Sequence, residues 1–449
     1  MRQLPKSLLG LILVTCSHSA NALDLSEAIN LAQQYDTTYQ IAFATYQAQS
    51  EASAQSMAAI LPQIDANGFI QRGETKSRVS GTSSTSDNNS DGYSLDLNQV
   101  IFDKTIYDNL SRGNAIVAKA AADLETARQD TILRVARAYF DVLVAIDTLD
   151  AASAAKKSIG KQLEQSKERF NVGLSAITDV KEQQASYDIA SADEITAIND
   201  LSNKREALRV LINVYPENLK IARNDIPLVV PEPMDINAWQ EKSLQANFSL
   251  LSAKYAVDAA QSAYDASNGG HYPTLSLNAA YSVVNTDERN FSGRIFPKNK
   301  ATDNSVILNL NIPIYSGGLT SSTIRQKLAE LNQAKALQEQ QKRLTIALAR
   351  SAYLSLEADI AKVKARKQAI ISSQSSLDAT QAGYDAGTRT SVDVLISQRQ
   401  LFDSQRDYSI ARYTYLANSL ALKGVAGTLT LNDIDAINKW LITSPDKPQ

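Results

Sequence analysis

The chain has 449 residues, 44% of them hydrophobic and 21% charged, with a formal net charge of −3 and a single cysteine. This balance excludes a nucleic-acid-binding protein, which needs a basic surface, and it excludes a fold built on disulfides. Enzyme chemistry is not indicated either. No glycine-rich phosphate loop follows a strand and no cluster of metal ligands stands out, so we expect no cofactor and no metal site.

The first 22 residues have the pattern of a secretory signal peptide. Two basic residues in "MRQLPK" precede the apolar run "SLLGLILVTC", and the small residues Ala20 and Ala22 place the cleavage site after Ala22. Cys16 offers the alternative of a lipoprotein signal, but Thr15 fits poorly immediately before a lipidated cysteine. No apolar run of about 18 residues follows, so the sequence predicts an exported protein without a transmembrane helix.

After the signal peptide the chain repeats one unit. Residues that match between the copies keep a nearly constant offset, which a chance motif would not do over so long a span. We expect a first repeat at 23–214, a proline-rich linker at 215–236, a second repeat at 237–428 and a polar, disordered tail at 429–449. The matched positions, at offsets of 211 to 214, are Pro62 and Pro273, Phe102 and Tyr315, Tyr139 and Tyr353, Gly173 and Gly387, and Asp179 and Asp393.

Each repeat has the same predicted elements in the same order. A helix comes first, followed by two strands around a polar loop, a very long helix, a glycine turn and a last helix. In the first repeat these are a helix over 24–60, strands over 64–71 and 93–102, and helices over 104–170 and 176–213. In the second they are a helix over 237–267, strands over 274–283 and 305–314, and helices over 318–384 and 391–423.

The predicted strands alternate apolar and polar residues. In "YSLDLNQVIF", Tyr93, Leu95 and Leu97 share one face, whereas Ser94 and Asp96 share the other. A soluble, half-buried sheet would show the same alternation. Strands of about ten residues, aromatic residues near their ends and long polar loops favour strands that cross an outer membrane. Four strands cannot close a barrel and an open edge in lipid is costly, so several chains must pool their strands, and a conducting pore favours three or more.

The long helices carry a second signal. At about 1.5 Å per residue, a helix over 318–384 would be roughly 100 Å long, which is far beyond a compact domain. Its apolar residues follow mixed steps of three and four, which makes a narrow coiled-coil seam with polar surface on both sides. Such a helix is typical of the wall of a water-filled tube.

Four motifs carry a family resemblance: "FNVGLSAITDV", "AGYDAGTRTSVDVL", "ARYTYLANSLALKGVAGTL" and "IPIYSGG". With the tandem repeat and the strand pairs, they make the chain similar to the TolC family of outer-membrane efflux proteins over essentially its whole mature length. The resemblance implies a mainly α fold with membrane β-structure. It implies a homotrimer whose 12-stranded β-barrel, with four strands per chain, is continued by a long α-helical barrel through the periplasm.

The resemblance also implies a function and partners. Members of the family are exit ducts in the outer membrane of Gram-negative bacteria, and they serve tripartite multidrug efflux pumps and type I secretion systems. They are passive conduits gated at the periplasmic entrance. The implied partners are a periplasmic adaptor (membrane fusion) protein, an inner membrane RND, ABC or MFS transporter, and outer membrane lipid. The alternative is a soluble periplasmic coiled-coil adaptor or structural spacer, which gives no reason for the paired strands.

Two of the motifs contain the glycine turns between the long and the last helices. Gly173 and Gly387 stand where a helix ends and a left-handed backbone is wanted. "TSVD" at 390–393 fits an N-cap, with an acidic residue at the positive end of the helix. A helix–turn–helix hairpin therefore explains the glycines and most of the aspartate pattern, but it explains neither Tyr384 nor Arg389.

The family resemblance assigns a role to these two residues. The residues that it implies as links between neighbouring coiled coils, which keep the periplasmic entrance shut, are Thr178, Asp179, Tyr384 and Arg389. It also implies an acidic ring of Asp393 side chains at the constriction, where clustered carboxylates would favour cations and raise one another's pKa. The family pattern has a second aspartate three residues later, whereas this chain has Ile396. That departure leaves the cation selectivity open.

Overall fold

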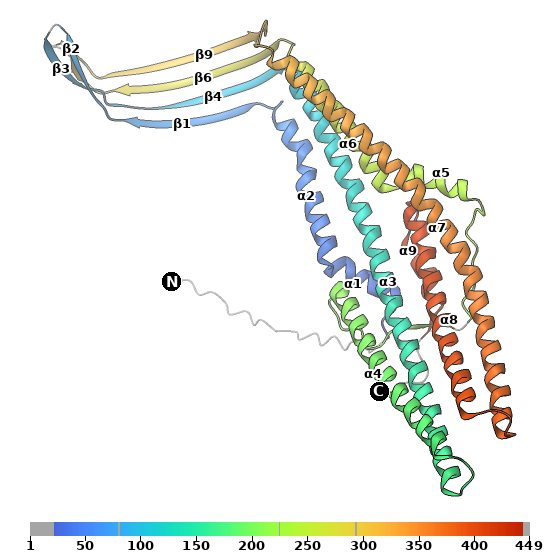
Figure 1. Ribbon diagram of the computed structural model, residues 1–449. Helices are drawn as coiled ribbons and strands as arrows, with labels where there is room; N and C mark the ends of the chain where they lie inside the picture. The colour runs from blue at the N-terminus through green and yellow to red at the C-terminus, as the bar shows by residue number, and fades with distance from the viewer. Residues whose placement is uncertain (1–21, 80, 224, 292–293, 443–449) are drawn as a thin grey trace, which may run out of the picture.

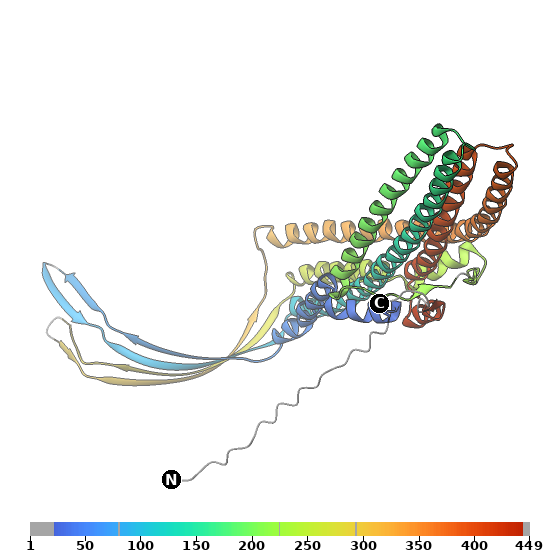
Figure 2. The same cartoon turned by 90° about the horizontal axis from the view of Figure 1, so that it is seen from below.

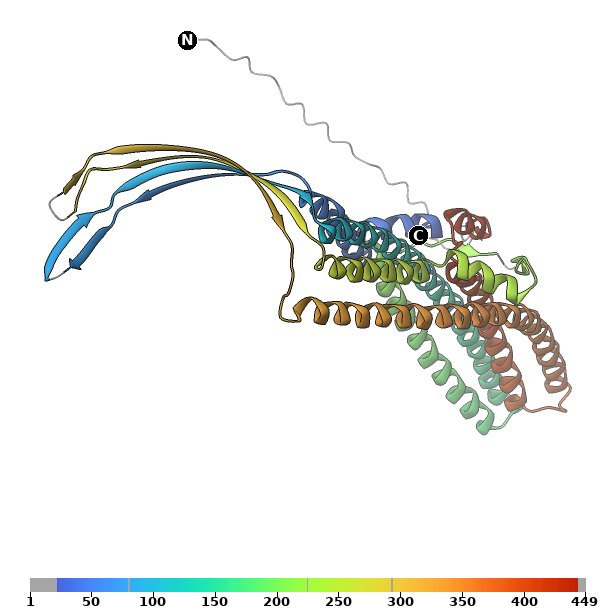
Figure 3. The same ribbon diagram turned by 90° about the horizontal axis from the view of Figure 1, so that it is seen from above.

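The computed structural model describes residues 22–79, 81–223, 225–291 and 294–442, and the molecule is elongated (Figure 1). A four-stranded sheet forms one end, and the tips of two helical hairpins form the opposite end. Figures 2 and 3 show the sheet curving away from the helices as a single thin layer. The predicted signal peptide, apart from Ala22, and Cys16 lie outside the described residues.

Each repeat begins with two short helices, so the single helices predicted over 24–60 and 237–267 are wrong. The pairs are α1 (Leu25–Tyr35) with α2 (Thr37–Ala58), and α5 (Ile236–Ala246) with α6 (Phe248–Gly269). Asp36 and Asn247 end one helix and cap the next, each through a side-chain oxygen that accepts a backbone N–H of the new helix. Short polar side chains favour caps over helix interiors, so both breaks could have been predicted.

The long helices form two antiparallel hairpins. α3 (Lys104–Asn171, 68 residues) turns into α4 (Ile177–Ile212), and α7 (Leu319–Asp385, 67 residues) turns into α8 (Ser391–Val425). α2 and α4 both pack along α3, and α6 and α8 both pack along α7 (Figure 1). Two shorter helices thus match one long helix, as the lengths predicted. α3 also packs on α6 and α8, which joins the two repeats.

The sheet takes two strands from each repeat. It contains β1 (Gln63–Gln71), β4 (Ser90–Phe102), β6 (Thr274–Thr286) and β9 (Asn299–Asn311), antiparallel in the order β1-β4-β6-β9. The repeats meet where β4 pairs with β6, with Tyr93 opposite Val283. β1 and β9 are the two edges of this sheet, and neither has a second partner strand within the described chain.

The strands differ from the prediction in their extent. β4 begins three residues earlier, β6 ends three residues later and β9 begins six residues earlier than predicted. Parts of the polar loops form short hairpins, which are β2 (Glu74–Val79) with β3 (Thr82–Asp87), and β7 (Arg289–Phe291) with β8 (Arg294–Phe296). The strand predicted over 305–314 ends at Asn311. The reason is Pro313, which has no N–H for a strand ladder and has a fixed φ.

The tail that was expected to be disordered belongs to the main core, so that prediction is wrong for residues 430–442. The segment forms α9 (Leu431–Asn438) and β10 (Leu441–Ile442), which pairs with β5 (Ile221–Ala222). Ile434 and Ile437 are at most 4% exposed and join the apolar cluster of α1, α3 and α8. A few well-placed apolar side chains order a segment whose average composition is polar. Residues 443–449 lie outside the described chain.

Candidate functional site

The two hairpin tips, residues 169–179 and 383–393, contain turns of the same kind. Gly173 and Gly387 have φ of +78° and +75°, a left-handed conformation that other residues seldom adopt. No atom lies within 4 Å of the position that a Cβ would take at either glycine. Backbone conformation, and not a lack of space, is therefore the reason for glycine in both tips.

The matched aspartates have different surroundings. Asp393 Oδ2 accepts hydrogen bonds from the Thr390 N–H (3.0 Å) and hydroxyl (2.9 Å), and Thr390 Oγ1 accepts from the Asp393 N–H (3.3 Å). This capping box starts α8, and the bond from the Thr390 N–H is the main cause that lowers the pKa of the Asp393 carboxyl. In the first tip the cap position is Ala176, which has no side-chain oxygen. The Asp179 carboxylate has no hydrogen bond or ion pair with another described residue.

The four residues expected at the gate are not bonded to one another across the two tips of one chain. Thr178 and Arg389 are exposed, and Asp179 and Tyr384 are half-buried. Within the described part of the chain, no hydrogen bond or ion pair joins Thr178 or Asp179 of the first tip to any residue of the second tip. Arg389 lies over Gly383, where a Cβ would be 2.8 Å from the arginine Cγ. The link expected among the four residues stays a prediction.

A contact that does join the tips was missed by sequence reasoning. The guanidinium of Arg169, in the last turn of α3, lies over the ring of Tyr384 with its Cζ 5.3 Å from the ring centroid. This distance is within the range of a cation–π interaction. Spacing within one repeat cannot indicate which side chain of the other repeat lies opposite, so no sequence signal pointed to this pair.

A groove of about 950 Å³ lies between the hairpins, with α3 and α4 on one side and α8 on the other. Its apolar lining includes Ile189 of α4 and Leu395, Ile396 and Phe402 of α8. Ile396 is 63% exposed there. One turn after Asp393, the α8 wall of the groove is therefore apolar where the family pattern has an acid.

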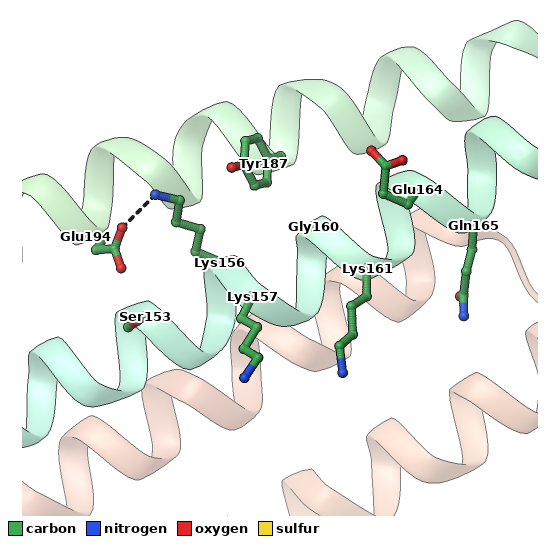
Figure 4. A pocket seen from close by; sticks show the side chains of 9 residues that line it. All are labelled: Ser153, Lys156, Lys157, Gly160, Lys161, Glu164, Gln165, Tyr187 and Glu194. Carbon is green, nitrogen blue, oxygen red and sulfur yellow. Dashed lines mark hydrogen bonds and ion pairs between the residues drawn. The ribbon is translucent and has the colours of Figure 1, made fainter. Parts of the chain in front are cut away.

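A second groove, of about 640 Å³, lies on the α3/α4 hairpin and is rich in lysine (Figure 4). Lys156 forms an ion pair with Glu194 of α4 at 2.7 Å, and this hydrogen bond raises the pKa of Lys156. Lys157 and Lys161 point away from α4, and neither has an acidic partner within the described part of the chain. This stretch of α3 therefore carries positive charge that the chain itself does not neutralise.

The described residues contain neither a cluster of metal ligands nor a membrane-spanning helix. No group of three or more His, Cys, Asp or Glu side chains there could hold a metal ion. Over the same residues, none of the helices combines the length and the apolar character that crossing a membrane requires.

A family match to both repeats of the chain establishes the family. The sequence pattern of the outer membrane efflux protein family matches residues 28–214 and 239–428. The chain belongs to the outer membrane efflux protein family. Outer membrane protein TolC of Escherichia coli is 34% identical over 447 residues, covering 98% of this chain and 90% of that protein. The alkaline protease secretion protein AprF of Pseudomonas aeruginosa is 28% identical, covering 97% of this chain and 91% of AprF.

The fold of this efflux protein agrees with the family. The crystal structure of the CmeC outer membrane channel of Campylobacter jejuni superimposes with a TM-score of 0.75 at 16% identity, covering 93% of this chain and 90% of that one. The predicted fold and family resemblance are thus confirmed, and the protein is an exit duct of the Gram-negative outer membrane. The alternative of a soluble periplasmic adaptor or spacer has no support among these relatives.

Proposed function

We propose that this efflux protein works as a homotrimer in which the strands of three chains close one barrel in the outer membrane. The observation that carries the proposal is the sheet with two unpaired edges, β1 and β9. An unpaired backbone group in lipid costs several kcal/mol, so β9 of one chain must pair with β1 of the next. On β9 the apolar side chains of one face stand bare in the single chain: Val306, Leu308 and Leu310 are 73%, 60% and 63% exposed.

The helical hairpins then form the wall of a tunnel that reaches into the periplasm. The duct performs no chemistry of its own, and an inner membrane transporter of the RND, ABC or MFS class supplies the work through a periplasmic adaptor protein. Relatives named for efflux, such as BepC of Brucella suis, and for protease secretion, such as AprF, support both uses of one duct. We therefore propose that drugs and secreted proteins are its cargo.

The tips of the hairpins are the proposed entrance, because they lie at the end opposite the sheet (Figure 1). Thr178 and Asp179 of one tip would bond Tyr384 and Arg389 of a neighbouring tip. The free carboxylate of Asp179 and the exposed guanidinium of Arg389 support this arrangement. Bonds between charged groups of this kind are short in range and strong enough to favour a closed state, yet an adaptor can reverse them.

A deletion strain tests the function as a whole. Without the protein, cells should become sensitive to detergents and large antibiotics and should lose a secreted protein from the medium. Expression of the full chain should restore both properties. A deletion strain with unchanged resistance and unchanged secretion would refute the proposed export role.

A double variant tests the gate. Tyr384→Phe with Arg389→Ser removes one hydroxyl and one guanidinium, so it should raise single-channel conductance in planar bilayers and make cells leaky to large antibiotics. Lys364→Ser, which removes a positive charge from the exposed surface of α7 away from the tip, is the control and should conduct as the wild type. Wild-type conductance in the double variant would rule out these residues as the gate.

A further inference from the structure

The duplicated tips are not equivalent in their arginine and aromatic residues. At positions 214 residues apart, the first tip has Arg169 and Phe170, and the second has Gly383 and Tyr384. Gly383 has no side chain, and the Arg389 side chain occupies the space beside it. Each tip therefore carries one arginine, before the glycine turn in the first tip and after it in the second. Only the first tip presents a cation from the last turn of its long helix.

Hydrogen bonds within the turns hold the backbone at both residues of the Arg169–Tyr384 contact. The Arg169 carbonyl accepts the Leu174 N–H (2.7 Å), and the Tyr384 carbonyl accepts the Gly387 N–H (3.0 Å). The main chain at each residue is thus tied to the turn that follows it. Both side chains are half-buried, and Arg169 has no ion pair with an acidic residue in the described chain. The Tyr384 ring is the partner that the structure gives to this guanidinium.

We propose that Arg169 is a further latch residue of the entrance, which holds the α3 tip to the α7 tip within each chain. The inference rests on the proposed gate. Arg169 contacts the face of the Tyr384 ring and leaves the hydroxyl at the ring edge free to bond. That hydroxyl has no hydrogen bond to another described residue. One tyrosine thereby serves two contacts of different chemistry. Its ring contacts Arg169 of the same chain, and its hydroxyl is left for the proposed gate bond.

The test is single-channel conductance of the purified trimer in planar bilayers, measured as a double-mutant cycle. Arg169→Gln should raise the ratio of open to closed channels by roughly two- to five-fold for each contact that is lost. This factor corresponds to the free energy of an exposed cation–π interaction. The same substitution should have its full effect in a Tyr384→Phe background, because the ring remains. In a Tyr384→Leu background it should have no further effect, because the ring is already gone.

Controls separate this contact from loss of charge and from the gate as a whole. Lys167→Gln removes a positive charge from the same helix end and should leave conductance unchanged. Lys167 forms an ion pair with Glu164 of its own helix at 2.9 Å and with no other acidic residue that the structure describes. An equal rise in Lys167→Gln and Arg169→Gln would overturn the latch, as would an equal effect of Arg169→Gln in the Phe and Leu backgrounds.

Asp179→Asn distinguishes the two proposals. If Asp179→Asn opens the channel and Arg169→Gln does not, the Arg169 latch is wrong while the gate stands. If neither substitution changes conductance, and the Tyr384→Phe with Arg389→Ser variant also conducts as the wild type, the gate itself is wrong. Opening by Arg169→Gln that depends on the ring of residue 384 supports the latch.

Discussion

Asp393 and Asp179 occupy matched positions in the two repeats, but their carboxylates differ in which oxygens remain free to bond another chain. Asp393 uses Oδ2 to cap its own helix, and Oδ1 has no hydrogen bond to another described residue. Within one chain the pKa of Asp393 is lowered, chiefly by the hydrogen bond from the Thr390 N–H. A ring of carboxylates is expected to shift the pKa in the opposite direction, because each carboxylate raises the pKa of the others. The side chain is therefore charged at neutral pH in the single chain, while the effect of the ring stays a prediction.

Asp393→Asn should abolish the cation preference of the trimer, measured as the reversal potential across a salt gradient in planar bilayers. Thr390→Ala is the matched control, because it removes the capping hydroxyl and keeps the carboxylate, so its cation preference should be that of the wild type. The preference of the wild type should fade as the pH falls through the pKa that Asp393 has in the assembled ring. That pKa lies below the ordinary aspartate value if the Thr390 N–H determines it, and above that value if the clustered carboxylates raise it. Unchanged selectivity in Asp393→Asn would remove the acidic ring.

At the scale of elements, local patterns predicted most of the structure. The glycine turns and the lengths of the long helices follow from single stretches of sequence, and the helix breaks could have been found at Asp36 and Asn247. Contacts between the repeats could not be found in this way. Arg412 of α8 pairs with Asp147 of α3 at 2.9 Å, and no spacing rule connects them. The same limit hid Arg169, because a partner on another element depends on packing and not on periodicity.

The helix α9 offers a test of how much the C-terminal segment stabilises the fold. Ile434 is fully buried, so Ile434→Ala should cost about 2–5 kcal/mol of unfolding free energy and lower the Tm measured by calorimetry. Leu431→Ala, on the same helix but at a residue 44% exposed, should change the free energy by no more than about 0.5 kcal/mol. Equal Tm values for the two variants would show that α9 does not pack as described.

At the scale of the whole molecule, a single chain leaves its functional parts unfinished. The sheet ends in two open edges, and none of the four proposed gate residues is bonded to another of them across the tips of one chain. Trimer assembly would supply partners for both parts if neighbouring chains pair their strands at one end of the molecule and bond their tips at the other. Under that proposal, assembly and closure of the duct are linked along the length of α3 and α7.

A charge on the lipid face of the barrel should impair this assembly. Leu308→Arg places a cation among the apolar side chains of β9, at a cost of about 2–4 kcal/mol if the site is near the middle of the bilayer. Asn309→Arg puts the same residue on the opposite, polar face and is the control. The yield of trimer on a semi-native gel should fall for Leu308→Arg and stay normal for Asn309→Arg. Similar yields would contradict the assignment of the two faces.

The strand order also has a consequence for biogenesis. β4 pairs with β1 on one side and with β6, which belongs to the other half of the chain, on the other, so the first two strands are complete before the second neighbour of β4 exists. Even the completed sheet keeps apolar side chains and two bare edges until further copies arrive. A row of unpaired backbone groups is a template for aggregation. The topology therefore leaves the edge strands of every newly folded chain open to incorrect pairing until neighbouring chains cover them.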